Sequence, residues 1–190
     1  MKTRARAFIA LGSNLGDRAA NLLLAVRGML DANLTIKTLS AIYETEPVST
    51  PGAETEANQN PYLNMVAELG EPLPAPEQLL ARLLRIEYAL GRRRTSSQLR
   101  TARTIDLDLL FYQNADGTHL TSSTDFLQLP HPRAHLRRFV LVPLNEIAPD
   151  LMHPTLHQTI HDLLSTTPDV AAVKLWKPPV ANTNQISPHT

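Results

Sequence analysis

The sequence contains no cysteine, few aromatic residues and no long apolar run. The lack of cysteine excludes disulfide bonds and thiolate metal sites, which suits the cytoplasm. An aromatic content of 5% leaves few rings for stacking against nucleic-acid bases. No segment approaches the roughly 18 apolar residues that a membrane helix needs, and the apolar run near the start is too short for a signal peptide. The sequence therefore predicts a cytoplasmic protein with no membrane and no nucleic-acid partner.

Lysine is also scarce. There are four Lys against 14 Arg, and no Lys lies between Lys37 and Lys174. The formal net charge is zero, which argues against general binding to nucleic acid or an anionic membrane. Eight of the Arg fall in two short stretches, 92–103 and 133–138. Because a guanidinium binds phosphate in a bidentate manner, this bias indicates a phosphate-rich ligand; a solvated charged surface is the alternative.

Hydrophobic periodicity and turn residues predict a mixed chain of strands and helices. The expected elements are, in chain order, a strand at 7–12, a helix at 17–31, strands at 34–45 and 62–69, a helix at 76–90 and a strand at 104–112. This order matches the split βαβ, or ferredoxin-like, sandwich, in which helices pack on one face of an antiparallel sheet. We therefore expect an α/β (α+β) fold of this class with a mainly antiparallel sheet.

Two segments lack an apolar period. Residues 46–61 contain three Pro and one Gly, which is typical of a long, mobile loop that acts as a lid. After about residue 165 the pattern is lost again, and the last residues are rich in Pro, Asn and Thr. We expect one domain over residues 1–165 and a poorly ordered C-terminal tail over residues 166–190.

Two aspartates interrupt the apolar strand expected at 104–112. Side chains alternate along a strand, so Asp106 and Asp108 share one face. The other face carries apolar side chains that fill the core, including Leu109 and Phe111. The backbone positions of the two residues are roughly 6.6 Å apart along the strand, so their carboxylates can converge on a hard cation such as Mg²⁺. An ordinary strand with two solvent-facing acids is the alternative, although like charges on one face favour a positive group between them.

The cations are close in sequence, because five Arg precede this strand within one loop: Arg92, Arg93, Arg94, Arg100 and Arg103. An arginine-rich loop that leads into an acidic pair indicates a polyphosphate with its metal ions. No G-x-x-x-x-G-K-[ST] motif is present, so a P-loop enzyme is excluded. The turn at residues 12–16 (GSNLG) is a weak signal; a plain strand-to-helix turn is favoured over a phosphate cradle.

Several other polar residues have a plain structural interpretation. Glu87 lies at the edge of a helical apolar stripe and is expected to reach water. His131 stands between two prolines and is either a turn residue or a site residue. His153, His157 and His161 are spaced four residues apart, but a proline intervenes and no carboxylate is near. We expect these three to be surface residues.

Six segments stand out as a series: ALGSNLGDR, YETEPV, PYLN, RIEYALGRRR, RTIDLDLLFY and LPHPRAHLRRFVLVPLNEIAPDL. In order, they resemble segments of the 6-hydroxymethyl-7,8-dihydropterin pyrophosphokinase family, from about residue 7 to about residue 165. RTIDLDLL followed by LPHPR and RRFVLVPL is specific to that family. The resemblance implies a ferredoxin-like pterin pyrophosphokinase domain, ATP as co-substrate and two Mg²⁺ ions. It also implies transfer of pyrophosphate to the hydroxymethyl group of 6-hydroxymethyl-7,8-dihydropterin, with release of AMP, in folate synthesis.

The resemblance also implies site residues. The metal ligands are Asp106 and Asp108, and the catalytic group comprises these two with Arg92 and Arg103. The pterin pocket is formed by Thr45, Pro47, Val48, Tyr62, Asn64 and Phe139, with Tyr62 and Phe139 sandwiching the ring. The ATP side is formed by Glu87, Arg92, Arg94, Arg103, His131 and Arg137. A monomer is expected.

The chain departs from the family at several positions. Arg100-Thr101-Ala102-Arg103 stands where Trp-Gly-Pro-Arg is frequent, Glu46 where Pro is common and Pro132 where an aromatic residue is common. Two other functions remain open. A nucleic-acid-binding ferredoxin-like module would need aromatics among basic residues on its sheet, where this chain carries the two aspartates. A nucleotidyltransferase could use the same acidic pair and would leave an adenylylated acceptor.

Overall fold

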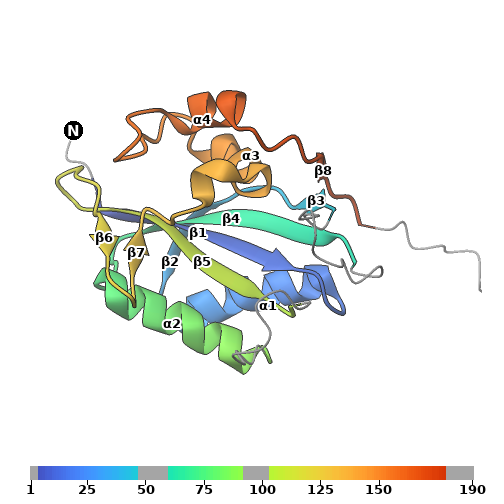
Figure 1. Cartoon of the computed structure of the whole chain (residues 1–190). Coiled ribbons are helices and arrows are strands. Elements are labelled where there is room, and N and C mark those ends of the chain that lie inside the picture. Colours follow the sequence, from blue (N-terminus) through green and yellow to red (C-terminus); the bar gives the residue numbers. More distant parts are fainter. Residues whose placement is uncertain (1–3, 47–59, 92–102, 179–190) are drawn as a thin grey trace, which may run out of the picture.

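The computed structural model describes residues 4–46, 60–91 and 103–178 (Figure 1). The strands are β1 (Arg6–Ser13), β2 (Thr35–Leu39), β3 (Tyr43–Thr45), β4 (Tyr62–Gly70), β5 (Asp106–Gln113), β6 (Ser122–Ser123), β7 (Gln128–Leu129) and β8 (Val173–Leu175). The helices are α1 (Arg18–Asp31), α2 (Pro76–Ala89), α3 (Arg138–Ile147) and α4 (Ile160–Thr166), with a short 3₁₀ turn, η1 (Ala134–Leu136). None of these helices is both long and apolar enough to cross a membrane, as far as the described residues go.

The main sheet has the strand order β5-β1-β4-β3-β8, and β2 also pairs with β4. Every pairing within it is antiparallel. β6 and β7 form a separate small hairpin. The expected mainly antiparallel sheet is therefore confirmed.

Helices cover both faces of this sheet, as Figure 1 shows, with α1 and α2 on one side and α3 and α4 on the other. The first face buries the larger core beneath α1 and α2, which includes Ile9, Leu83 and Leu107. The second face buries a separate core beneath α3 and α4, which includes Phe8 and Val66. The expectation of helices on one face holds for α1 and α2, and the second helical layer is an addition to it.

The ends of α1 and α2 follow from local chemistry. Asp17 caps α1 by accepting a hydrogen bond from the Ala20 backbone N–H at 3.0 Å. Pro76 occupies the first turn of α2, where its missing N–H costs nothing. Gly91 follows the end of α2 with φ +89°, a conformation that other residues rarely adopt.

The single strand expected at 34–45 is divided, so this prediction is wrong in its extent. Between β2 and β3 the Ser40 N–H donates to Val66 O at 2.9 Å, while the Ser40 Oγ accepts from Val66 N–H at 2.9 Å. A hydroxyl thus takes the place of a backbone carbonyl in the ladder. The next residue, Ala41, turns its N–H to the Glu146 carboxylate of α3, at 3.0 Å from Oε2. These side-chain bonds interrupt the strand without breaking its contact with β4.

β5 contains a bulge that the alternating pattern did not reveal. Ile9 pairs with Leu109 and Phe8 pairs with Phe111, so Leu110 is an extra residue on β5. Leu110 and Phe111 consequently both enter the core under α3. The expectation that Phe111 shares a core with Leu109 is therefore wrong.

The C-terminal part of the chain continues the sheet. β8 pairs with β3, so residues 173–175 of the expected tail belong to the sheet, and the part from 179 onward lies outside the described residues. His153 is buried, with 2% of its surface exposed, which corrects the expectation of a surface residue. His157 and His161 are exposed, as expected.

Candidate active site

The site lies at one end of the sheet face that α3 and α4 cover elsewhere. At this end Gly12 of β1 is flanked by Asn64 of β4 on one side and by Asp106 of β5 on the other. Ala10 is similarly paired with Asp108. Cross-strand partners present their side chains to the same face, so the amide and both carboxylates point toward one region.

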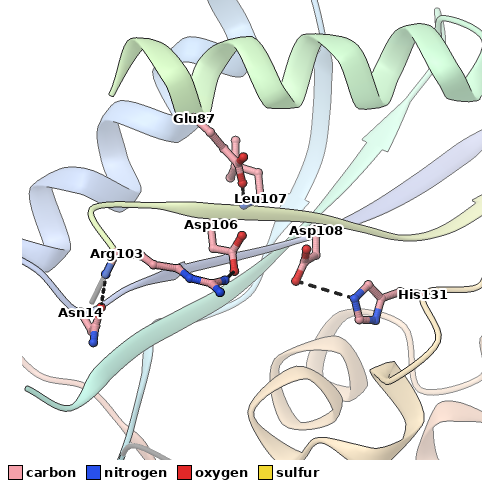
Figure 2. Close-up of polar contacts among 7 residues, drawn as sticks. All are labelled: Asn14, Glu87, Arg103, Asp106, Leu107, Asp108 and His131. Atoms are coloured by element: carbon pink, nitrogen blue, oxygen red, sulfur yellow. Dashed lines mark hydrogen bonds and ion pairs between the residues drawn. The ribbon is translucent and has the colours of Figure 1, made fainter. Parts of the chain in front are cut away.

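Asp106 and Asp108 are partly exposed on this face, while Leu107 between them is buried on the other face. The predicted shared orientation of the two carboxylates is thus confirmed, and Figure 2 shows them projecting from the same side of β5. The Arg103 guanidinium forms a hydrogen-bonded ion pair with the Asp106 carboxylate. His131 Nε2 lies 3.9 Å from Asp108 Oδ2. The structure therefore brings a cation and an imidazole to the acidic pair.

The charges in this group perturb one another. Burial acts to lower the pKa of the Arg103 guanidinium, but the attraction and hydrogen bond to Asp106, together with Tyr62 and Asp108, raise the pKa overall. Burial lowers the pKa of His131, which Asp108 only partly offsets. Burial likewise lowers the pKa of Arg137, assisted by repulsion from Arg133. A cluster of partly buried cations beside two carboxylates can hold a polyanion and its counter-cations.

Asn64 forms the polar floor beside the acidic pair. Its side chain is 6% exposed, and its Nδ2 donates to Thr45 Oγ1 at 2.9 Å. A Cβ at Gly12 would lie 3.2 Å from Asn64 Oδ1, so the glycine leaves room for the amide. The Thr45 bond therefore fixes an amide orientation in which the oxygen lies on the Gly12 side.

The two aromatic residues expected around the pterin come from different elements. Tyr62 begins β4, and burial raises the pKa of its hydroxyl, with Arg103 and Asp106 acting in opposite directions. Phe139 lies in the first turn of α3, packs against the core under that helix, and has the Arg137 guanidinium carbon 5.4 Å from its ring centroid. Tyr62 thus interacts electrostatically with Arg103 and Asp106 at the acidic end of the site, whereas the ring of Phe139 lies against Arg137.

Glu87 differs from the other expected ATP residues. Its side chain is 2% exposed, and its Oε1 accepts a hydrogen bond from the Leu107 N–H at 2.7 Å. In Figure 2 it approaches β5 from α2, on the side of the strand opposite to Asp106 and Asp108. The expectation that it reaches water is wrong, because its carboxylate binds the backbone of an edge strand.

Four expected residues, Pro47, Val48, Arg92 and Arg94, lie outside the described residues. Conversely, the structure adds Ser13 and Asn14, which contact the chain at residues 103–104. Sequence reasoning treated the GSNLG turn as a plain connection. The sequence signal for a role of this turn was a pair of small polar residues, Ser13 and Asn14, at the end of a buried strand.

The residues present fit a magnesium site completed by substrate. Mg²⁺ is commonly bound through one or two carboxylates together with substrate phosphates, rather than by a cage of protein ligands. Asp106 and Asp108 offer such oxygen ligands on one face. The described ranges contain no group of three or more His, Cys, Asp or Glu side chains that could hold a metal ion by themselves.

Comparison with solved structures shows the fold. The chain superposes on a crystal structure described as HPPK-DHPS in complex with substrates with a TM-score of 0.61 at 17% identity, covering 85% of this chain and 43% of that one. A Plasmodium falciparum HPPK-DHPS structure with pterin and p-hydroxybenzoate gives a TM-score of 0.61 at 16% identity, over 87% and 43%. The chain thus spans less than half of these longer proteins. At this identity the likeness concerns the fold alone, and it confirms the ferredoxin-like class.

Sequence comparison shows the family. The model for 7,8-dihydro-6-hydroxymethylpterin-pyrophosphokinase (HPPK) matches residues 8–149. The chain is 38% identical to 2-amino-4-hydroxy-6-hydroxymethyldihydropteridine pyrophosphokinase of Bacillus subtilis, over 90% of each protein. It is 33% identical to the folic acid synthesis protein FOL1 of Dictyostelium discoideum, over 93% of this chain but only 25% of that protein. The chain therefore belongs to the 7,8-dihydro-6-hydroxymethylpterin-pyrophosphokinase family of enzymes.

Proposed function

We propose that this chain transfers the β,γ-pyrophosphoryl group of ATP to the hydroxymethyl oxygen of 6-hydroxymethyl-7,8-dihydropterin and releases AMP, as a step of folate synthesis. The observation that carries the proposal is the Arg103–Asp106 ion pair with Asp108 beside it, on the same sheet face as the Asn64 amide. Cations and carboxylates on one face suit a triphosphate with its metal ions. The family match supplies the identity of the acceptor.

In this reaction the hydroxymethyl oxygen attacks the β-phosphorus of ATP, and the bond from that phosphorus to the α,β-bridging oxygen breaks. Phosphoryl transfer of this kind requires positioning and charge neutralisation rather than covalent participation by the protein. We assign the neutralisation to Arg103 and to Arg92. The anchoring of the nucleotide is assigned to His131, which lies 3.9 Å from Asp108, and to Arg137, which interacts electrostatically with both aspartates. Glu87 and Arg94 complete the proposed ATP side.

Asp106 and Asp108 would hold two Mg²⁺ ions together with the triphosphate. When bound, these ions neutralise phosphate charge and polarise the attacking hydroxyl. The carboxylates suit this purpose because they are partly exposed and lie on a strand whose opposite face is core. A strand buried on one side holds both ligands at a fixed spacing.

The pterin is proposed to lie between Tyr62 and Phe139, with its polar edge against Asn64. Flat heterocycles gain from stacking between aromatic rings, and an amide can pair with a neighbouring donor and acceptor on the ring edge. Thr45 supports this contact because its hydroxyl holds Asn64 Nδ2. Pro47 and Val48 complete the proposed pocket.

The test is incubation with ATP, Mg²⁺ and 6-hydroxymethyl-7,8-dihydropterin, followed by chromatography of nucleotides and pterins. The proposal requires AMP and a pyrophosphorylated pterin in equal amounts. ADP as the stoichiometric product would overturn it. An adenylylated pterin with free pyrophosphate would instead identify a nucleotidyltransferase.

We further propose that the enzyme is a cytoplasmic monomer without a nucleic-acid partner. The supporting observations are the absence of cysteine and the balanced charge of the chain. Gel filtration tests the oligomeric state, since a monomer of 21.0 kDa elutes well apart from a dimer. Filter binding with RNA tests whether the protein has a nucleic-acid partner, and retention of RNA at physiological salt would contradict the proposal that it has none.

A further inference from the structure

We infer that Ser13 and Asn14 are positioning residues, which hold the backbone at Arg103 and Thr104 so that the Arg103 guanidinium meets Asp106. From the sequence alone, the turn that contains these two residues was interpreted as a plain strand-to-helix connection. The inference rests on the proposed function only where it concerns the rate of transfer. Its structural part, a clamp between two chain segments far apart in sequence, stands on contacts alone.

Three hydrogen bonds form the clamp. The Asn14 N–H donates to Arg103 O at 3.1 Å, and the Arg103 N–H donates in return to Asn14 Oδ1 at 2.6 Å. Ser13 Oγ donates to Thr104 O at 2.6 Å. Figure 2 shows Asn14 meeting the Arg103 backbone in the segment that leads into β5. Three backbone groups of the consecutive residues Arg103 and Thr104 are therefore held by two consecutive residues of the turn.

The clamp is itself well anchored. Ser13 and Asn14 are 0% and 1% exposed. Asn21 of α1 donates from Nδ2 to Ser13 Oγ at 3.2 Å and to Leu15 O at 2.8 Å, which ties the turn to the helix. Asn14 Nδ2 is buried and has no hydrogen-bond partner within the described part of the chain. An unsatisfied buried donor is unfavourable, so Nδ2 does not stabilise this side chain in its place. The contribution of the side chain to the clamp therefore comes from its acceptor, Oδ1.

The need for a clamp follows from the nature of the Arg103–Asp106 contact. The two side chains are 30% and 22% exposed, and a partly exposed ion pair does not by itself hold a long side chain in one geometry. Arg103 directly follows an arginine-rich segment and precedes β5 by three residues. Fixing its backbone on both sides therefore reduces the conformations from which the guanidinium must reach its position.

The kinetic test is a double-mutant cycle between Asn14→Ala and Arg103→Ala. If Asn14 acts through Arg103, Asn14→Ala lowers kcat by roughly tenfold to a hundredfold, with KM for the pterin close to that of the wild type. In the Arg103→Ala background the same substitution should then have little further effect. The same factor in both backgrounds would overturn the inference. Ser13→Ala removes one of the three clamp bonds, that to Thr104 O, together with the bond from Asn21 Nδ2, and is the second variant should Asn14→Ala fail to fold.

A second measurement is independent of the reaction. Hydrogen exchange of the Arg103 amide, followed by NMR in the protein without ligands, should be slow in the wild type and fast in Asn14→Ala. Thr159→Ala is the matched control, because it removes the N-cap hydroxyl of α4 far from the site and lowers stability without touching the clamp. Equal Arg103 exchange in the wild type and in Asn14→Ala would overturn the clamp. If the wild type shows the clamp but no pyrophosphoryl transfer, the proposed function fails while the structural part of the inference stands.

Discussion

At the residue scale, the two aspartates of the site differ in their surroundings. Asp106 is bonded to Arg103, whereas Asp108 has His131 at 3.9 Å. Both carry negative charge on the same strand face, so each also repels the other. Neutralising either one relieves that repulsion, and at position 106 it also removes the charge that is hydrogen-bonded to the Arg103 guanidinium.

We predict that Asp106→Asn and Asp108→Asn each nearly abolish kcat and remove the thermal stabilisation that Mg²⁺-ATP gives. An amide oxygen is a poor ligand for Mg²⁺, so the charge balance of the bound triphosphate is lost. Without ligands, Asp108→Asn should melt at or above the wild-type temperature and Asp106→Asn below Asp108→Asn. The exposed Asp150→Asn is the control. Near-normal turnover of both site variants would make the pair structural.

Phe139→Ala and Tyr62→Ala should weaken the binding of the pterin far more than that of ATP. Stacking on a planar ring contributes roughly 0.5–1.5 kcal/mol beyond burial, and the lost contact area adds to it, so a tenfold loss or more is expected. Calorimetric titration with each ligand measures both effects. Phe126→Ala, at a ring that is 53% exposed, is the control. Equal losses for both ligands in both variants would refute the assignment.

The sequence was sufficient for some of these residues and not for others. The shared face of Asp106 and Asp108 follows from strand alternation alone. The burial of His153 and Glu87 could not be predicted, because it depends on elements distant in sequence. His153 packs its ring against Phe111, with centroids 5.5 Å apart, and Glu87 reaches the backbone of β5.

At the scale of elements, one buried carboxylate adds a hydrogen bond to the apolar packing between α2 and β5. β5 is an edge strand of the sheet, so its outward N–H groups need partners other than a neighbouring strand. Glu87 supplies one by accepting from the Leu107 N–H. This bond lies directly behind the acidic pair.

Glu87→Ala should therefore lower the free energy of unfolding by about 1–3 kcal/mol, since it leaves a buried N–H without this acceptor. Glu87→Gln retains a carbonyl oxygen and should cost less. Urea denaturation measures both, with Glu77→Ala at an exposed position of the same helix as the control. If Glu87→Ala lowered the free energy of unfolding no more than the control does, the result would count against the hydrogen bond. If Glu87→Gln kept its full stability but bound ATP more weakly, the result would favour a direct role of Glu87 in binding ATP.

The elements also show where local patterns stop being informative. Helix α2 was expected to begin at Pro76 and end before Gly91, because both signals are local. The interruption between β2 and β3 was not predictable, since it depends on Val66 and Glu146 from other parts of the chain. The same holds for β8, whose three residues form a strand only because β3 offers a free edge.

At the scale of the whole molecule, one buried histidine makes stability depend on pH. Burial, with repulsion from His135 and His119, lowers the pKa of His153 from its ordinary 6.5 to about 4. Its Nδ1 accepts from the backbone N–H groups of Leu156, at 3.3 Å, and Thr155, at 3.4 Å, which requires that nitrogen to be unprotonated. The unfolded chain therefore takes up the proton at a higher pH than the folded protein does.

It follows that stability falls as the pH is lowered from about 6.5 to about 4, by up to about 3 kcal/mol, and that this contribution does not change further below that range. Urea unfolding at a series of pH values measures it. His153→Asn keeps an acceptor near the position of Nδ1 and cannot titrate, so it should be less stable at pH 7 but show a shallower pH dependence. His161→Gln, at an exposed histidine, should retain the wild-type slope. An unchanged slope in His153→Asn would contradict the assignment.

The bulge at Leu110 has a consequence for length changes in the gene. Phe8 opposes both Leu110 and Phe111, so a codon deletion at position 110 would restore regular pairing while leaving Asp106 and Asp108 on their face. A deletion at Leu107 would instead transfer one aspartate to the sheet face that α1 and α2 cover. Insertions and deletions in β5 should therefore be tolerated during evolution at this one point, and relatives that differ in strand length should differ there, after the acidic pair rather than within it.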